Sequence, residues 1–198
     1  LGTGGMGSVY LVIDQTRQKS GDKDARLALK FMSPKLAQNE KARSRFVSES
    51  KARKLSHPHI VDTIEIHDWT ARKLLYITME YVPGQNLRQH LLDAKGQPPF
   101  PLTTTLELMR QLLAALDFAH KSTIHRDIKP ENLLVVIPED GSRPILKLTD
   151  FGIARQFDDD GQHRTRGAMG TEQYMAPEQE EGAAVDARAD LYSVGVVL

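Results

Sequence analysis

Two short polar motifs bracket a predicted β-hairpin, and this arrangement constrains the fold of the chain more than any other feature. The first motif, H-R-D-I-K-P-E-N at 125–132, ends where the apolar run 133–136 begins. The turn-forming segment P-E-D-G-S separates this run from a second one at 145–148, which leads into D-F-G. Two β-rich runs joined by such a turn predict a hairpin. We therefore expect Asn132 and Asp150, which are distant in sequence, on neighbouring strands of one sheet.

The polar side chains of these motifs suit the transfer of a phosphoryl group. A serine or threonine hydroxyl is a weak nucleophile at neutral pH, so a carboxylate such as Asp127 would accept its proton and orient it. Lys129 would neutralise charge on the group in transfer. Asn132 and Asp150 offer the hard oxygen ligands that magnesium prefers. Taken singly, these residues are better explained as ordinary loop or capping residues, so the prediction depends on the joint pattern.

A glycine-rich segment opens the chain, where G-T-G-G-M-G-S-V at 2–9 fits the pattern G-x-G-x-x-G-x-V. Glycines let backbone amides close over phosphates. The same spacing opens dinucleotide-binding folds in which a helix follows, but here the β-rich run 9–13 follows. This context favours a nucleotide lid and argues against a dinucleotide oxidoreductase. The run L-A-L-K-F at 27–31 is similar to the V-A-I-K strand, so Lys30 is predicted to reach the α- and β-phosphates.

Together these motifs resemble the eukaryotic-like (Hanks-type) serine/threonine protein kinases, and G-G-M-G-S-V-Y, H-P-H-I-V and Y-M-A-P-E-Q are most similar to the bacterial branch. The resemblance covers nearly all of the chain. It implies an α+β, bilobal protein-kinase-like fold, with a small, mostly β N-lobe at 1–79 and a hinge at 80–84. A mostly helical C-lobe at 85–198 would be C-terminally incomplete, lacking the final helices of the family.

The resemblance also implies the reaction and the ligands. The chain would phosphorylate serine or threonine hydroxyls of protein substrates with ATP and Mg²⁺, or alternatively Mn²⁺. Asp127 would be the base, Lys129 and Lys30 would assist it, and Asn132 and Asp150 would hold the metal. The implied nucleotide-binding residues are Leu1, Gly2, Gly4, Gly7, Val9, Ala28, Lys30, Met79, Glu80, Val82, Glu131 and Leu134.

A glutamate on a helix predicted over about 38–55 is the least regular part of the pattern. Glu49 stands in R-F-V-S-E, which resembles the F-x-x-E motif of the family, and would hold Lys30. The interval from Glu49 to His57 is one residue shorter than usual, and Arg53 stands where an apolar residue is expected. Pairing of Glu49 with Arg53 on a solvated helix face is therefore the alternative. A nucleotide-binding pseudokinase or regulatory scaffold is the alternative function.

Two threonines are predicted to regulate the site. A phosphate on Thr165 would pair with Arg126, next to the base. For Thr171, the alternative to phosphorylation is a hydrogen bond near Asp127 and Lys129. Autophosphorylation between two copies would need a dimer.

Two further residues are predicted to support the catalytic loop. By resemblance, Asp190 in D-A-R-A-D-L-Y-S-V-G would brace the backbone of this loop, and His125 would pack beneath Phe151. Apolar residues recurring at i, i+3 and i+4 over 106–120 predict the amphipathic helix that precedes it.

Composition argues against nucleic-acid binding, disulfide bonding and a membrane span within this sequence. With 26 basic and 26 acidic residues the formal charge is zero, so bulk electrostatics suggests no attraction to nucleic acid or to a membrane. No cysteine is present, which rules out disulfides and is compatible with a reducing cytosol. The sequence has no apolar run of the roughly 20 residues that a membrane span needs. We expect a cytoplasmic domain cut from a longer product, with any anchor outside it left open.

Overall fold

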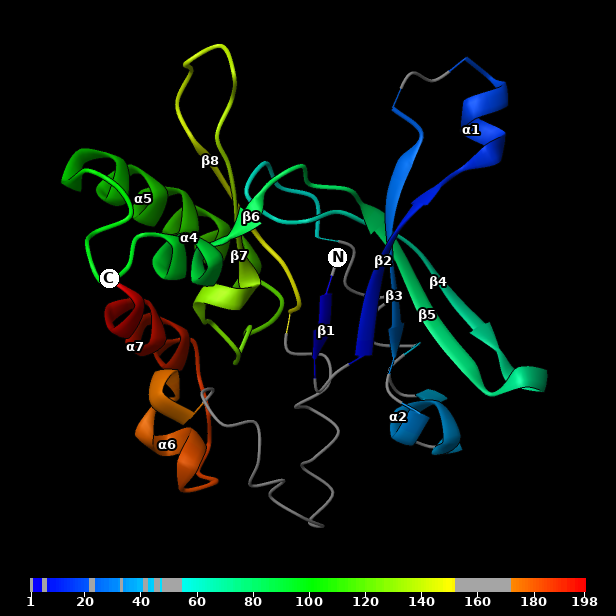
Figure 1. The fold of residues 1–198 in the computed structure, drawn as a ribbon. Helices are drawn as coiled ribbons and strands as arrows, with labels where there is room; N and C mark the ends of the chain where they lie inside the picture. The colour runs from blue at the N-terminus through cyan, green and yellow to red at the C-terminus, as the bar shows by residue number, and fades with distance from the viewer. Residues whose placement is uncertain are drawn as a thin grey trace. The chain divides into compact units, whose positions relative to one another are not determined.

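The computed structural model describes residues 2–4, 7–21, 24–32, 34–40, 43–44, 47, 55–151 and 172–198. The chain divides into two compact units. The first comprises Leu1–Ser56 and Asp62–Val82, and the second comprises His57–Val61 and Pro83–Leu198. The first unit is built mainly of strands, whereas the second holds the longer helices (Figure 1). The helix predicted over about 38–55 falls largely outside the described residues.

The described strands of the first unit form an antiparallel sheet in the order β1-β2-β3-β5-β4. These strands are β1 (Gly2–Gly4), β2 (Gly7–Ile13), β3 (Arg26–Met32), β4 (Thr63–Trp69) and β5 (Leu74–Glu80). Short helices accompany them: α1 (Gln15–Lys19), α2 (Pro34–Gln38) and the 3-10 helix η1 (Thr70–Arg72).

Alternating side chains decide which face of this sheet is buried. In β5, Leu75, Ile77 and Met79 are buried, while Tyr76 and Thr78 between them are only half-buried. Successive strand residues point to opposite faces, so the apolar ones gather on one side. That side forms the core of the first unit.

Gly7 begins β2 with a backbone conformation and a close contact that only glycine tolerates. Its φ is +138°, and a Cβ built there would lie 1.8 Å from the carbonyl oxygen of Phe31. Gly4 and Gly7 are paired across β1 and β2, so the glycine motif forms the end of a hairpin. The strand predicted after the glycine motif is present as β2.

The second unit contains a small antiparallel sheet in the order β6-β7-β8, with helices around it (Figure 1). The strands are β6 (Gln85–Asn86), β7 (Leu133–Val136) and β8 (Ile145–Leu148). The helices are α4 (Leu87–Asp93), α5 (Leu102–Ala119), α6 (Pro177–Glu180) and α7 (Arg188–Val197), together with the 3-10 helices η2 (Pro130–Asn132) and η4 (Glu172–Tyr174).

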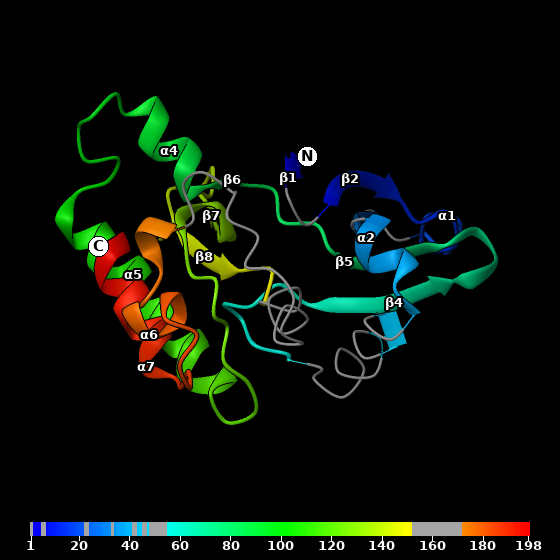
Figure 2. The ribbon, with the colours of Figure 1, turned by 90° about the horizontal axis from the view of Figure 1, so that it is seen from below.

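Helix α5 packs against β8 (Figures 1 and 2). Leu108, Leu112 and Leu116, at i, i+4 and i+8, are at most 2% exposed, as expected for the inner stripe of an amphipathic helix. Gln111 joins the two elements because its Nε2 donates to the Pro144 carbonyl (3.1 Å) and its Oε1 accepts from the Leu146 N–H (2.7 Å).

Two backbone hydrogen bonds add one distant segment to the small sheet. The Leu148 N–H donates to the His59 carbonyl, and the Val61 N–H donates to the Leu148 carbonyl, each at 2.9 Å. The segment His57–Val61 is thus tied to the second unit. Gly84 passes so close to β7 that an added Cβ would meet the Val135 carbonyl oxygen at 2.4 Å.

Within the described ranges, no helix combines the length and apolar character needed to cross a bilayer.

Candidate active site

The β7–β8 hairpin brings Asn132 and Asp150 to one end of the small sheet. Leu133 pairs with Leu148, and the next residue, Thr149, donates its N–H to the Asn132 carbonyl (3.0 Å). The hairpin is therefore as predicted, but Asn132 ends η2 and Asp150 follows β8, so both flank the strands instead of lying on them. Asp150 also has a positive φ of 60°, which turns the chain directly after the sheet.

Asp127 presents a buried carboxylate to two neighbouring side chains. It is 4% exposed. The Lys129 ammonium lies 2.9 Å from Oδ2 and 3.2 Å from Oδ1, and Asn132 Nδ2 donates to Oδ2 at 3.1 Å. The same amide nitrogen donates to the Asp127 carbonyl (2.7 Å). Because the nitrogen of this amide faces Asp127, its oxygen is the atom directed elsewhere.

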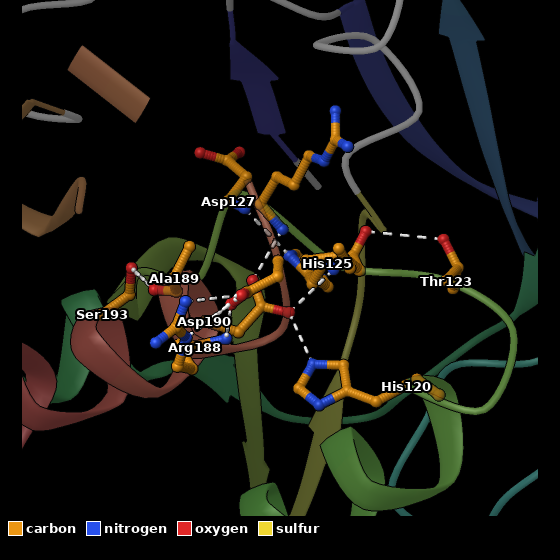
Figure 3. A network of polar contacts seen from close by, with 12 residues as sticks. His120, Thr123, His125, Asp127, Arg188, Ala189, Asp190 and Ser193 are labelled. Atoms are coloured by element: carbon orange, nitrogen blue, oxygen red, sulfur yellow. Dashed lines mark hydrogen bonds and ion pairs between the residues drawn. The ribbon is translucent and has the colours of Figure 1, made fainter. Parts of the chain in front are cut away.

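Asp190 holds the backbone that leads to Asp127 (Figure 3). This carboxylate is 1% exposed. Its Oδ2 accepts from the His125 N–H (2.8 Å) and from His120 Nε2 (2.8 Å), and its Oδ1 accepts from the Arg126 N–H (2.7 Å). The predicted bracing of the catalytic loop by Asp190 is confirmed.

His125 lies inside this network as a neutral packing residue. The Asp127 N–H donates to its Nδ1 (3.2 Å), so Nε2 carries the proton and donates to the Thr149 carbonyl (3.0 Å). Complete burial lowers the pKa of His125, which favours the neutral ring. Its ring centroid lies 4.7 Å from that of Phe151, so the two rings pack together as the family resemblance implied.

In the first unit, four predicted nucleotide-binding residues share one face of the sheet. Val9 pairs with Lys30, and Ala28 pairs with Met79, while Ala28 and Lys30 are two residues apart on β3. Ala28, Lys30 and Met79 are buried and Val9 is half-buried. Glu80 ends β5, two residues before the buried Val82. The sheet thus places Lys30 on the same face as Val9, Ala28 and Met79.

The remaining predicted site residues divide into two groups. Leu134 is half-buried on β7, and Glu131 is exposed on η2, with its carboxylate 3.9 Å from Arg88. Gly2 and Gly4 bound β1. Four lie outside the described residues: Leu1, Glu49, Thr165 and Thr171.

Comparison with known proteins decides the family. The chain is 39% identical over 204 residues to the serine/threonine-protein kinase pkn3 of Myxococcus xanthus. The matched region is all of this chain and 35% of that protein. It is 38% identical over 201 residues to the serine/threonine-protein kinase PknD of Mycobacterium tuberculosis, covering 100% and 28% respectively. The model of the protein kinase domain matches residues 1–198. The chain belongs to the protein kinase family.

The fold of this kinase domain agrees with that family. The crystal structure of the Mycobacterium tuberculosis PknI kinase domain matches with a TM-score of 0.73 and 32% identity, covering 100% of this chain and 67% of that one. The predicted kinase fold and the resemblance to bacterial serine/threonine kinases are therefore confirmed. The kinase domain spans about a third of the length of the curated relatives described above.

Two residues of the kinase site were not recognised from sequence. The sequence pattern places His120 on the inner face of the predicted helix and indicates no polar role, yet its ring donates to Asp190. Gln179, directly after the A-P-E motif, donates from Nε2 to the Arg126 carbonyl (3.0 Å). The position of a polar residue beside a motif was the only signal that pointed to Gln179.

Proposed function

We propose that this kinase domain transfers the γ-phosphoryl group of ATP to serine or threonine hydroxyls of protein substrates, with Asp127 as the base. The observation that carries the proposal is a buried carboxylate held from two sides, by Lys129 and Asn132, at the end of a backbone that Asp190 braces. Such fixed orientation is what a general base needs.

In the proposed reaction, Asp127 accepts the hydroxyl proton as the substrate oxygen bonds to phosphorus and the bond to ADP breaks. Lys129, already beside Asp127, would also contact the group in transfer and offset its negative charge. Thr171 would hydrogen bond near this pair. The acceptor side chain belongs to a protein substrate, as the names of the relatives suggest.

The donor set of the second unit fits a magnesium ion. The Asn132 amide oxygen and the Asp150 carboxylate are hard ligands, and the hairpin joins their backbones. Magnesium is commonly held by one or two protein groups and otherwise by water and substrate phosphates. When bound, Mg²⁺ would neutralise phosphate charge, and Mn²⁺ could use the same donors.

The first unit would bind the nucleotide. The glycine hairpin has the bare backbone needed to approach phosphates closely, and Lys30 would contact the α- and β-phosphates. Val9 and Ala28 would cover the adenine, with Met79 beside them. The backbone of Glu80 and Val82 would pair with its edge.

A phosphoryl-transfer assay on the full-length protein tests this proposal. With magnesium, labelled ATP and a basic protein substrate, Asp127→Asn and Lys30→Met should each lower turnover by about 10² to 10⁴. Asp127→Asn should keep its nucleotide affinity, whereas Lys30→Met should misalign the phosphates. The control is Asp117→Asn, because that carboxylate is 83% exposed on α5.

Two outcomes would count against the proposal. Wild-type turnover in Asp127→Asn would remove this residue as the base. A wild-type protein that binds ATP without transferring phosphate would favour the pseudokinase alternative.

A further inference from the structure

The backbone immediately before Asp127 has an unusual conformation. Arg126 has a φ of 65°, in the left-handed region that residues with a side chain seldom occupy. A conformation of this kind persists only where the surrounding structure holds it. The peptide group that follows Arg126 carries the N–H of Asp127, so its orientation sets the direction in which the chain enters the proposed base.

Both polar atoms of this peptide group are held by side chains. Its N–H, from Asp127, donates to His125 Nδ1 at 3.2 Å. Its carbonyl oxygen, from Arg126, accepts from Gln179 Nε2 at 3.0 Å. Because the peptide unit is planar, fixing its oxygen and its nitrogen fixes the plane. Asp190 holds the preceding peptide through the Arg126 N–H, so it does not duplicate the contact made by Gln179.

The amide of Gln179 is itself oriented from the other end. Its Oε1 accepts from the Ala176 N–H (3.3 Å), and its own backbone N–H donates to the Ala176 carbonyl (2.9 Å). This is the glutamine half of a capping box at the start of α6. One planar amide therefore accepts from the A-P-E segment and donates to the catalytic loop.

We propose that Gln179 is a positioning residue for the phosphoryl-transfer reaction, which holds the Arg126–Asp127 peptide so that the Asp127 carboxylate is correctly aimed. This inference rests on the proposed function of Asp127. The proposed role requires a side chain as long as glutamine that donates to the Arg126 carbonyl and accepts from the Ala176 N–H. A carboxylate at the same position would cap α6 equally well but would set an oxygen against the Arg126 carbonyl.

Two substitutions separate positioning from helix capping. Gln179→Met removes both side-chain hydrogen bonds and keeps a side chain of similar size. Gln179→Glu keeps the acceptor for the Ala176 N–H and loses the donor to the Arg126 carbonyl. In the full-length protein we expect both to lower kcat by about 10- to 100-fold, with KM for ATP within about twofold of wild type. The matched control is Gln89→Met, which removes one exposed glutamine hydrogen bond, to Asp93 on α4.

Hydrogen–deuterium exchange supplies a readout that does not depend on activity. In Gln179→Met, the amides of residues 125–128 should exchange about tenfold faster, because one hydrogen bond of the clamp is lost. Helix α5 should keep its protection, and Gln89→Met should leave the amides of residues 125–128 unchanged.

Several results would overturn the inference. Wild-type kcat in Gln179→Met would show that the contact is not needed, and wild-type kcat in Gln179→Glu would reduce Gln179 to a helix cap. If wild-type protein transfers no phosphate, the proposed function fails. The exchange experiment alone then decides whether Gln179 holds the Arg126–Asp127 peptide. Unchanged exchange at residues 125–128 in Gln179→Met would refute the clamp.

Discussion

Replacing Asp190 with alanine should destabilise the kinase domain and abolish its turnover together. One buried carboxylate accepts from three groups among the described residues, namely the His125 and Arg126 N–H groups and the His120 ring. Alanine would leave these donors facing an apolar methyl group. Because two of them belong to the backbone beside Asp127, the loss affects both the fold and the proposed base.

The size of the effect follows from the number of donors left without a partner. Each buried donor that loses its acceptor costs about 1–3 kcal/mol, so the two backbone groups account for about 2–6 kcal/mol. Part is recovered because a charge no longer has to be desolvated. Water can also reach His120, whose side chain is 16% exposed. We expect a net loss of about 3–4 kcal/mol, a large share of a typical margin of about 5–15 kcal/mol.

Asp190→Asn should be milder. Its carbonyl oxygen still serves one or two donors, while its NH₂ group opposes the rest, so about 1–2 kcal/mol should be lost. The two variants thus give a graded series from one position.

Urea unfolding and phosphoryl transfer, measured on the full-length protein, test this series. The control is Asp117→Ala, because this carboxylate is 83% exposed and pairs with Lys121 at the surface, where ion pairs contribute little. Asp190→Ala with the unfolding midpoint and turnover of wild type would refute the reasoning.

Three further predictions concern the hinge, the buried histidine and regulation. Gly84→Ala should lower the unfolding free energy by about 1–3 kcal/mol, measured in urea, because its Cβ would meet the Val135 carbonyl at 2.4 Å. Burial lowers the pKa of His125, so the unfolded chain binds a proton that the folded chain excludes. Stability should therefore fall as the pH drops below about 6.5, and urea titrations of His125→Asn should show a flatter dependence. Mass spectrometry of active protein should find phosphate on Thr165, and Thr165→Ala or Arg126→Ala should lower turnover; unmodified Thr165 in fully active protein would contradict this.

Local sequence patterns were sufficient to predict the β7–β8 hairpin, although Asn132 and Asp150 flank its strands and do not lie on them. The runs that became β7 and β8 are short, apolar and joined by a turn, so their pairing depends on neighbouring residues alone. At the glycine motif, the β-rich run 9–13 predicted the strand that is observed as β2, whereas its pairing with β1 is seen only in the structure. The family resemblance then identified Asp190 as a brace of the catalytic loop.

One segment that precedes the predicted hinge bonds to a strand that follows it. His57–Val61 precedes β4 in sequence, yet its backbone bonds to β8 and it belongs to the second unit. Cutting the chain once, at the hinge, leaves this segment with the first unit. Backbone hydrogen bonds to a distant strand leave no periodic signal in the sequence, so local patterns do not reveal them.

The sequence by itself therefore determined the family, the strand pairs formed by local turns and the residue types of the proposed site. Only the tertiary structure decided which groups hold those residues in place. Asp190 reaches donors 64 and 65 positions away, and Gln179 reaches a carbonyl 53 positions away. Residue type and spacing show that a side chain can donate or accept a hydrogen bond. Its partner is fixed by packing, which brings distant buried groups together because a buried polar atom must be paired there.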